Sequence, residues 1–274
     1  MSIPLVSLIV PPFLLYLTLF IFGAIVGSFL NVCIVRLPKE ESIVSPPSRC
    51  PHCKRPIPFY DNIPLISYLY LRGRCRFCDE SISPRYFFVE LLTGTLALAL
   101  LGRFGIGVAF FVNFIFVAAL VVIACVDLQV RIVPDVISLP GIVLGFTLSI
   151  VQRPWPLDHL SIPPSPTSSI LGIVAGGGTL LAVALAYHSF TGVEGMGGGD
   201  IKLLAMIGAF LGWPSIPVTL FAASLSGSVV GLAFMLKKGV DSKYALPFAP
   251  FLCMGAFFHL FVGRELIVRY LPFG

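Results

Sequence analysis

Long apolar stretches separated by short polar segments dominate the chain. The first runs from Pro11 to Val35, and seven more follow at about 86–102, 106–126, 136–151, 168–188, 201–212, 214–236 and 244–263. An α-helix needs about 20 apolar residues to cross a bilayer, so most of these stretches predict membrane spans, and 201–212 predicts a partial crossing. We expect an all-α polytopic membrane protein with about eight transmembrane helices and no β-sheet.

One hydrophilic segment, from Lys39 to Arg85, interrupts this pattern. Its surplus of arginine and lysine predicts a cytoplasmic location by the positive-inside rule, which puts the N-terminus outside. Counting spans forward brings the loops at 127–135, 188–200 and 237–243 to the same cytoplasmic side. The lysines of the last loop support this count, and eight spans leave both termini outside.

The composition excludes an ordinary soluble domain, because 57% of the residues are apolar and only 11% are charged. Soluble proteins carry about 25% charged residues. The net charge of +5 is concentrated between Arg36 and Arg85, so it bears on topology, and we expect no nucleic-acid partner. The first apolar run lacks a basic segment before it, and we expect it to stay as a span rather than be cleaved as a signal peptide.

Four cysteines in the hydrophilic segment form two Cys-x-x-Cys pairs, Cys50 with Cys53 and Cys75 with Cys78. About 21 residues separate the pairs, a spacing that predicts a structural zinc ion held by four thiolates. A pair of disulfides or redox-active thiols is the alternative, but a reducing cytoplasm disfavours disulfides. His52 then stands beside the metal site without binding to it.

A glycine run leads to Asp200 at the start of a short apolar stretch: Gly195-Met196-Gly197-Gly198-Gly199-Asp200. A charge near hydrocarbon is disfavoured by roughly 2.5–3.5 kcal/mol, so such residues are often functional. Glycines let another backbone, such as an extended peptide, come close. A helix that begins near Asp200 favours the ionised carboxylate. The structural alternative is an N-cap at the end of a glycine-rich loop, and both interpretations stand.

Asp127 ends another long apolar stretch and lies on the same side as Asp200. Two neighbouring carboxyl groups can share one proton, which leaves one acid and one base to activate water on a peptide carbonyl. Asp135 follows a proline and is better explained as an N-cap of the next helix. Glu194 and Lys202 either tune Asp200 or are interfacial charges whose heads reach into water.

These motifs give the chain a family resemblance. The segment from Glu194 to Leu203, together with Asp127 and the run Ile132 to Asp135, resembles the type IV prepilin peptidases, which are glycine-x-glycine-aspartate intramembrane aspartyl proteases. Further segments are similar to the same family: Gly27–Pro38, Asp61–Tyr68, Leu71–Cys75 and Ile82–Glu90. The resemblance implies that Asp127 and Asp200 are the catalytic residues.

The resemblance also implies a substrate, a location and a second activity. Prepilins and pseudopilins carry a short basic leader, a glycine before the cut and then a hydrophobic helix. A protein of this family removes the leader at the cytoplasmic face of the bacterial inner membrane, in contact with the bilayer. It commonly also N-methylates the new terminus with S-adenosylmethionine. The glycines at 195–199 are not a dinucleotide-binding fingerprint, so the cofactor-binding residues stay unassigned.

We divide the chain by function into 1–38, the first span with its motif, 39–85, the zinc domain, and 86–274, the protease core. Three alternatives stay open. The first is a peptidase without methyltransferase activity. The second is a proton-coupled transporter, since paired intramembrane carboxylates and glycine-broken helices also mark those proteins, although internal repeats are not evident. The third is a non-catalytic assembly scaffold with a zinc domain.

Overall fold

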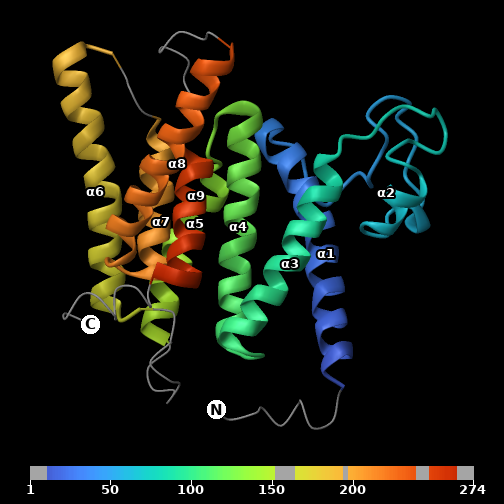
Figure 1. Ribbon diagram of the computed structural model, residues 1–274, viewed down its shortest axis with the longest axis horizontal. Coiled ribbons are helices and arrows are strands. Elements are labelled where there is room, and N and C mark those ends of the chain that lie inside the picture. Colours follow the sequence, from blue (N-terminus) through green and yellow to red (C-terminus); the bar gives the residue numbers. More distant parts are fainter. Residues whose placement is uncertain (1–10, 152–163, 194–196, 239–246, 264–274) are drawn as a thin grey trace. The chain divides into compact units, whose positions relative to one another are not determined.

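A computed structural model describes residues 11–151, 164–193, 197–238 and 247–263. The regular secondary structure of the described residues is helical, as predicted, with nine α-helices and, in the hydrophilic segment, two isolated antiparallel bridges (Figure 1). Their bounds are α1 Pro12–Arg36, α2 Ile66–Tyr70, α3 Arg85–Phe104, α4 Val108–Val130, α5 Asp135–Val151, α6 Pro166–Thr191, α7 Gly198–Leu211, α8 Ser215–Lys238 and α9 Ala249–Phe258, which a π-turn extends over His259–Gly263. Each apolar stretch identified in the sequence forms one of these helices.

Five helices are long and apolar enough to cross a membrane: α1 with the turn after it, α3, α4, α6 and α8. The chain is therefore a multi-pass membrane protein. Helix α5 and the segment Ala249–Gly263 are apolar but shorter, and α7 has 14 residues. About eight spans would require these three elements to cross the membrane as well, and for them the crossing stays a prediction.

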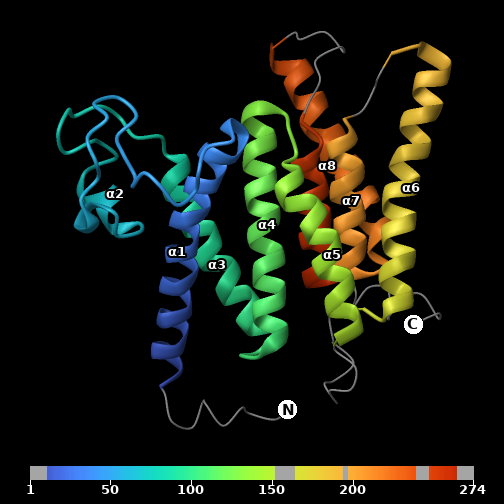
Figure 2. The same ribbon diagram turned by 180° about the vertical axis from the view of Figure 1, so that it is seen from behind.

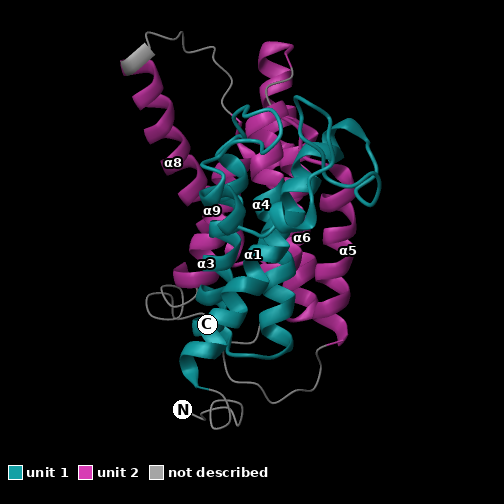
Figure 3. Ribbon diagram, turned by 90° about the vertical axis from the view of Figure 1, so that its right-hand side faces the viewer, with its two compact units in different colours: residues 1–122 teal, residues 123–274 magenta. Residues whose placement is uncertain are grey.

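The chain forms two compact units, residues 1–122 and 123–274, and the division between them falls within α4 (Figure 3). Both aspartates identified in the sequence belong to the second unit, and all four paired cysteines belong to the first.

In the first unit α1 packs along α3 (Figure 1). Two glycines of α1 make this approach close, because a Cβ on Gly23 or Gly27 would lie 2.8 Å from the Cα of Gly94 or Glu90, respectively. Small residues in membrane helices allow such backbone contact. This packing fixes the ends of α1 and α3 that border the hydrophilic loops.

In the second unit α7 is the central helix, and it packs against α5 and α6 on neighbouring sides (Figure 2). Every residue from Leu203 to Leu211 is buried. The backbones of α6 and α7 meet at Gly172 and Gly208, and the Ser169 hydroxyl donates a hydrogen bond of 2.9 Å to the carbonyl of Ala209. A short helix enclosed in this way is held by protein contacts rather than by lipid.

Gly172→Ala is expected to destabilise the protein by about 1–3 kcal/mol, because the added methyl group would collide with the Gly208 backbone. Gly178 lies on the same helix with no heavy atom within 4 Å of an added Cβ. Gly178→Ala should leave stability unchanged or slightly raised, since alanine favours a helix by up to about 1 kcal/mol over glycine. Thermal unfolding of both variants in detergent measures the difference, and equal midpoints would contradict the proposed close packing.

Candidate functional site

Asp127 lies in the last turn of α4 and is only 5% exposed. Its Oδ2 accepts a hydrogen bond of 3.2 Å from the backbone N–H of Ala249, the first residue of α9. Arg131, which directly follows the helix, interacts electrostatically with the carboxylate. A buried carboxylate needs such partners, and these two orient Asp127 at the end of its helix.

Asp200 is the third residue of α7, because the helix begins at Gly198 and its N-cap is Gly197. The structural alternative of an N-cap is therefore wrong for Asp200, and the helix begins three residues earlier than expected. Gly199 explains the early start: a Cβ there would lie 2.7 Å from the Cβ of Val133, in the segment between α4 and α5. Only glycine allows the first turn of α7 to pack so closely against that segment.

The second unit brings the two aspartates together, although they are far apart in sequence. The two carboxyl groups lie within electrostatic range of each other. Buried Cys253 of α9 interacts with both carboxylates, so the ends of α4, α7 and α9 meet at one place. This arrangement places two carboxyl groups near the start of the buried helix α7.

Asp135 and Lys202 form an ion pair, and both carboxylate oxygens lie 2.7 Å from the lysine Nζ. Asp135 is itself the first residue of α5, so the prediction that it caps this helix is off by one position. The sequence alone did not indicate that Lys202 binds to Asp135. The pair joins the first turns of α5 and α7 and thereby fixes the turn that carries Asp200. Glu194 lies outside the described residues.

The first unit brings the four predicted cysteines together. Their sulfur atoms all lie within 4.8 Å of one another, and Cys50 and Cys78 are 3.8 Å apart. A tetrahedral zinc with bonds of about 2.3 Å needs sulfur atoms separated by about 3.8 Å. The set therefore fits zinc, and His52 is not part of it.

The two cysteine pairs have the same local structure. An antiparallel bridge closes each turn, Arg49 with Pro56 in one and Arg74 with Ser81 in the other. In each turn the first cysteine accepts a backbone hydrogen bond from a residue with positive φ, Lys54 in one and Asp79 in the other. This repeated geometry directs two sulfur atoms from each turn to one point.

The thiols differ in acidity. The backbone N–H of Phe77 lowers the pKa of Cys75 to about 7. The backbone N–H of Glu80 lowers the pKa of Cys78, but burial and the neighbouring sulfur atoms outweigh it and raise that pKa to about 12. If all four cysteines are ionised, their negative charges lie close together, and a bound divalent cation compensates them.

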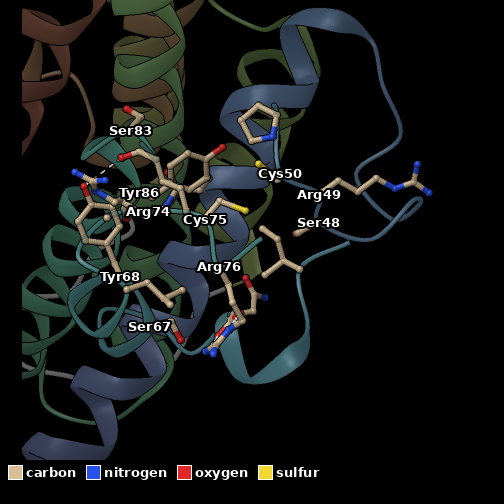
Figure 4. A pocket seen from close by; sticks show the side chains of 18 of the residues that line it. Ser48, Arg49, Cys50, Ser67, Tyr68, Arg74, Cys75, Arg76, Ser83 and Tyr86 are labelled. Carbon is tan, nitrogen blue, oxygen red and sulfur yellow. Dashed lines mark hydrogen bonds and ion pairs between the residues drawn. The ribbon is translucent and has the colours of Figure 1, made fainter. Parts of the chain in front are cut away.

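The first unit also contains a cavity of about 410 Å³, bordered by α1, α3 and the cysteine-containing loops (Figure 4). Its wall includes Asn31 and Glu90, which are 1% and 7% exposed. Both residues lie in segments that resemble the family, Gly27–Pro38 and Ile82–Glu90. Both could have been identified from the sequence as candidate functional residues, because each is a polar residue inside an apolar stretch.

Comparison with protein families gives two matches that together cover most of the chain. Residues 21–104 match the bacterial peptidase A24 N-terminal domain. Residues 114–232 match the type IV leader peptidase family. The first match contains the four cysteines and the cavity, and the second contains Asp127 and Asp200.

Curated relatives are similar over most of this chain. A protein of Aeromonas hydrophila is 34% identical over 95% of each chain, and one of Xanthomonas campestris pv. campestris is 35% identical over 92% of each chain. A protein of Myxococcus xanthus is 40% identical over 81% of this chain and 63% of its own. All three are named prepilin leader peptidase/N-methyltransferase, whereas no solved structure matches the chain significantly. The chain thus belongs to the type IV prepilin peptidase family, peptidase A24, as its aspartate and glycine motifs indicated.

Proposed function

We propose that the protein is a membrane-embedded aspartyl endopeptidase that uses Asp127 and Asp200 to remove the leader of type IV prepilins or pseudopilins. The observation that carries this proposal is the meeting of the two carboxyl groups in the second unit. The names of the relatives supply the substrate class. The cut follows the glycine of the substrate and occurs at the cytoplasmic face of the bacterial inner membrane.

The two carboxyl groups divide the acid–base work of hydrolysis. Carboxyl groups at close range share one proton, so one aspartate takes a proton from the attacking water while the other donates one to the carbonyl oxygen or the leaving amine. The Ala249 N–H holds the Asp127 carboxylate in place. The Asp135–Lys202 ion pair holds the first turn of α7, and with it Asp200. These contacts maintain the pair before substrate arrives.

The hydrophilic region supports this core. We propose that Cys50, Cys53, Cys75 and Cys78 bind one structural zinc ion that folds residues 39–85 into a cytoplasmic domain. Residues 1–38 then form the first span and its motif, and 86–274 form the protease core. All apolar helices outside the zinc domain lie in the bilayer, with about eight crossings.

We further propose an N-methyltransferase activity, which the names of the relatives support. When bound, S-adenosylmethionine would supply the methyl group that the new α-amine takes up, with S-adenosylhomocysteine and a proton as the other products. The first unit of the chain has the role of holding this donor. The second unit has the role of producing the free amine.

The two activities are expected to be separable. Asp200→Asn should remove cleavage but still methylate a pilin that has already been cleaved, because methyl transfer does not need the aspartate pair. Purified enzyme, mature pilin and labelled S-adenosylmethionine provide the assay. If folded Asp200→Asn protein loses methylation as fully as cleavage, the two-site proposal fails. If the unaltered enzyme never transfers a methyl group, the protein is a peptidase alone.

A further inference from the structure

The short helix α2 of the first unit turns an apolar side outward. Ile66, Leu69 and Tyr70 lie at helical spacing on one side of it and are 63–77% exposed. Phe59 and Ile63, in the segment that precedes α2 and lies beside it, are exposed as well. We call these five side chains the α2 face. Large apolar side chains gathered at a protein surface mark a contact with a partner or a membrane.

The other side of α2 is held by polar contacts and by α3. Ser67 is buried, and its hydroxyl donates a hydrogen bond of 3.0 Å to the carbonyl of Tyr60. The Tyr68 hydroxyl donates to the carbonyl of Ile82 at 3.2 Å, and the Tyr68 ring packs on Phe87 of α3, with centroids 5.6 Å apart. A helix at a water-facing surface has the reverse pattern, with its apolar side turned inward. These contacts therefore keep the α2 face directed away from the protein.

A contact with Glu90 fixes the level of α2 along α3. The backbone N–H of Leu65, which directly precedes α2, donates a hydrogen bond of 2.7 Å to Glu90 Oε2. Glu90 lies five residues beyond Arg85, the first residue of α3. At 1.5 Å per residue this contact is about 7.5 Å along α3 from the end that borders the hydrophilic segment. Figures 1 and 2 likewise show α2 level with the upper part of α3 rather than above its end.

This level corresponds to the interface of a membrane. Helix α3 is one of the five helices that can cross a bilayer, and its 20 residues span about 30 Å, the thickness of the hydrocarbon core. Its first residue, Arg85, therefore lies near one surface. Amphipathic helices at an interface bury their apolar side about 5–10 Å into the boundary of headgroups and acyl chains. Phe88 of α3 is 62% exposed at the same level, so lipid already reaches the protein there.

The charges near the α2 face suit an anionic membrane surface. Residues 39–85 contain eight lysines and arginines against five acidic residues. Arg72 follows α2 closely, is exposed and forms no ion pair among the described residues. Its backbone N–H donates to the carbonyl of Leu69 at 3.1 Å, which keeps Arg72 at the edge of the α2 face. A guanidinium group binds phosphate through paired hydrogen bonds, so Arg72 is suited to a lipid phosphate.

We infer that the α2 face inserts into the membrane leaflet at which α3 begins, and that Arg72 binds the phosphate of an anionic phospholipid there. Phe59 and Tyr70 then lie at headgroup level, where aromatic rings are stabilised. The cysteine-containing loops are thereby held against the bilayer by α2 as well as by the adjoining spans. The inference depends on neither proposed activity, so its failure would leave the proposed function intact.

The test cross-links lipid to the full chain, with one copy in each nanodisc of phosphatidylethanolamine and phosphatidylglycerol. The probe is a phosphatidylglycerol with a photoreactive group at the start of its acyl chain, and mass spectrometry identifies the labelled peptides. Residues 59–72 of the unaltered protein should be labelled. The double variant Ile66→Ser/Leu69→Ser should lose label about tenfold, because removal of these side chains from water drives the contact. Val44→Ser is the matched control, since Val44 is 87% exposed but lies outside the α2 face.

A second comparison tests the charge. The phosphatidylglycerol probe should label residues 59–72 about fivefold more strongly than a phosphatidylcholine probe, and Arg72→Gln should remove this preference. Arg49→Gln should keep it, because Arg49 is exposed and its side chain extends away from the other labelled side chains in Figure 4. Equal labelling of the unaltered protein by both probes would overturn the role of Arg72.

Two results would overturn the insertion of the α2 face itself. One is the absence of label over residues 59–72 in the unaltered protein, which would leave a second copy of the chain or the substrate to cover the face. The other is undiminished label in the double serine variant with an unchanged midpoint of thermal unfolding.

Discussion

Replacing either Asp127 or Asp200 by asparagine is expected to abolish prepilin cleavage while the chain stays folded. An amide has almost the size of a carboxyl group, but it neither takes up nor delivers the proton that hydrolysis requires. Positioned acid–base groups contribute about 10²–10⁴-fold to a rate, so each variant should lose at least that much. In Asp127→Asn the amide oxygen still accepts the Ala249 N–H, which preserves the contact between α4 and α9. Leader removal by purified enzyme measures the effect.

Asp79→Asn is the matched control for this experiment. Its side chain is 79% exposed and pairs with Arg74 at 2.8 Å, so the substitution makes the same chemical change in the first unit. Exposed ion pairs contribute little to stability, and this variant should cleave at the normal rate. Near-normal cleavage by either variant of the pair would refute the assignment of Asp127 and Asp200.

Cys50→Ser or Cys75→Ser is expected to release the zinc ion, from about one per chain to none, and to unfold the loops around it. Structural zinc sites contribute on the order of 10–16 kcal/mol in small peptides, far more than the stability of a short loop region. The contact of α1 with α3 should survive, because it depends on Gly23 and Gly27 rather than on the metal. Elemental analysis and limited proteolysis of residues 39–85 measure the two effects.

Cys33→Ser supplies the comparison, since Cys33 is buried on α1 and lies outside the four-cysteine cluster. It should keep both the zinc and the protease resistance of the loops. Unaltered protein that contains no zinc and whose four paired thiols react readily with an alkylating reagent would exclude the metal site.

The helices could be predicted because each membrane span is a long apolar stretch, a signal that depends on one segment at a time. The cysteine pairs could be predicted equally well as a metal site, since such a site requires particular residues at short spacing. The start of α7 was missed by three residues because Gly198 and Gly199 suggest a loop. Their helical state depends on Val133, which approaches Gly199 from a distant part of the sequence.

Contacts between distant segments explain the other differences. The ion pair of Lys202 with Asp135 joins residues 67 positions apart, and no local pattern indicates it. The cavity likewise needs α1, α3 and the cysteine loops together. Asn31 and Glu90 stand out as polar residues in apolar stretches, but their shared wall appears only once α1 packs against α3.

The length of α7 limits how far its two ends can reach. At 1.5 Å per residue its 14 residues span about 21 Å, whereas the hydrocarbon core of a bilayer is about 30 Å thick. If the Gly212 end of α7 reaches one surface of the hydrocarbon core, the first turn of α7, which carries Asp200, lies about 9 Å below the opposite surface. An extended chain covers that depth with about three residues. The bond to be cut would therefore be drawn about three residues beneath the cytoplasmic surface, and substrates with bulky or charged residues in that stretch should be cleaved more slowly.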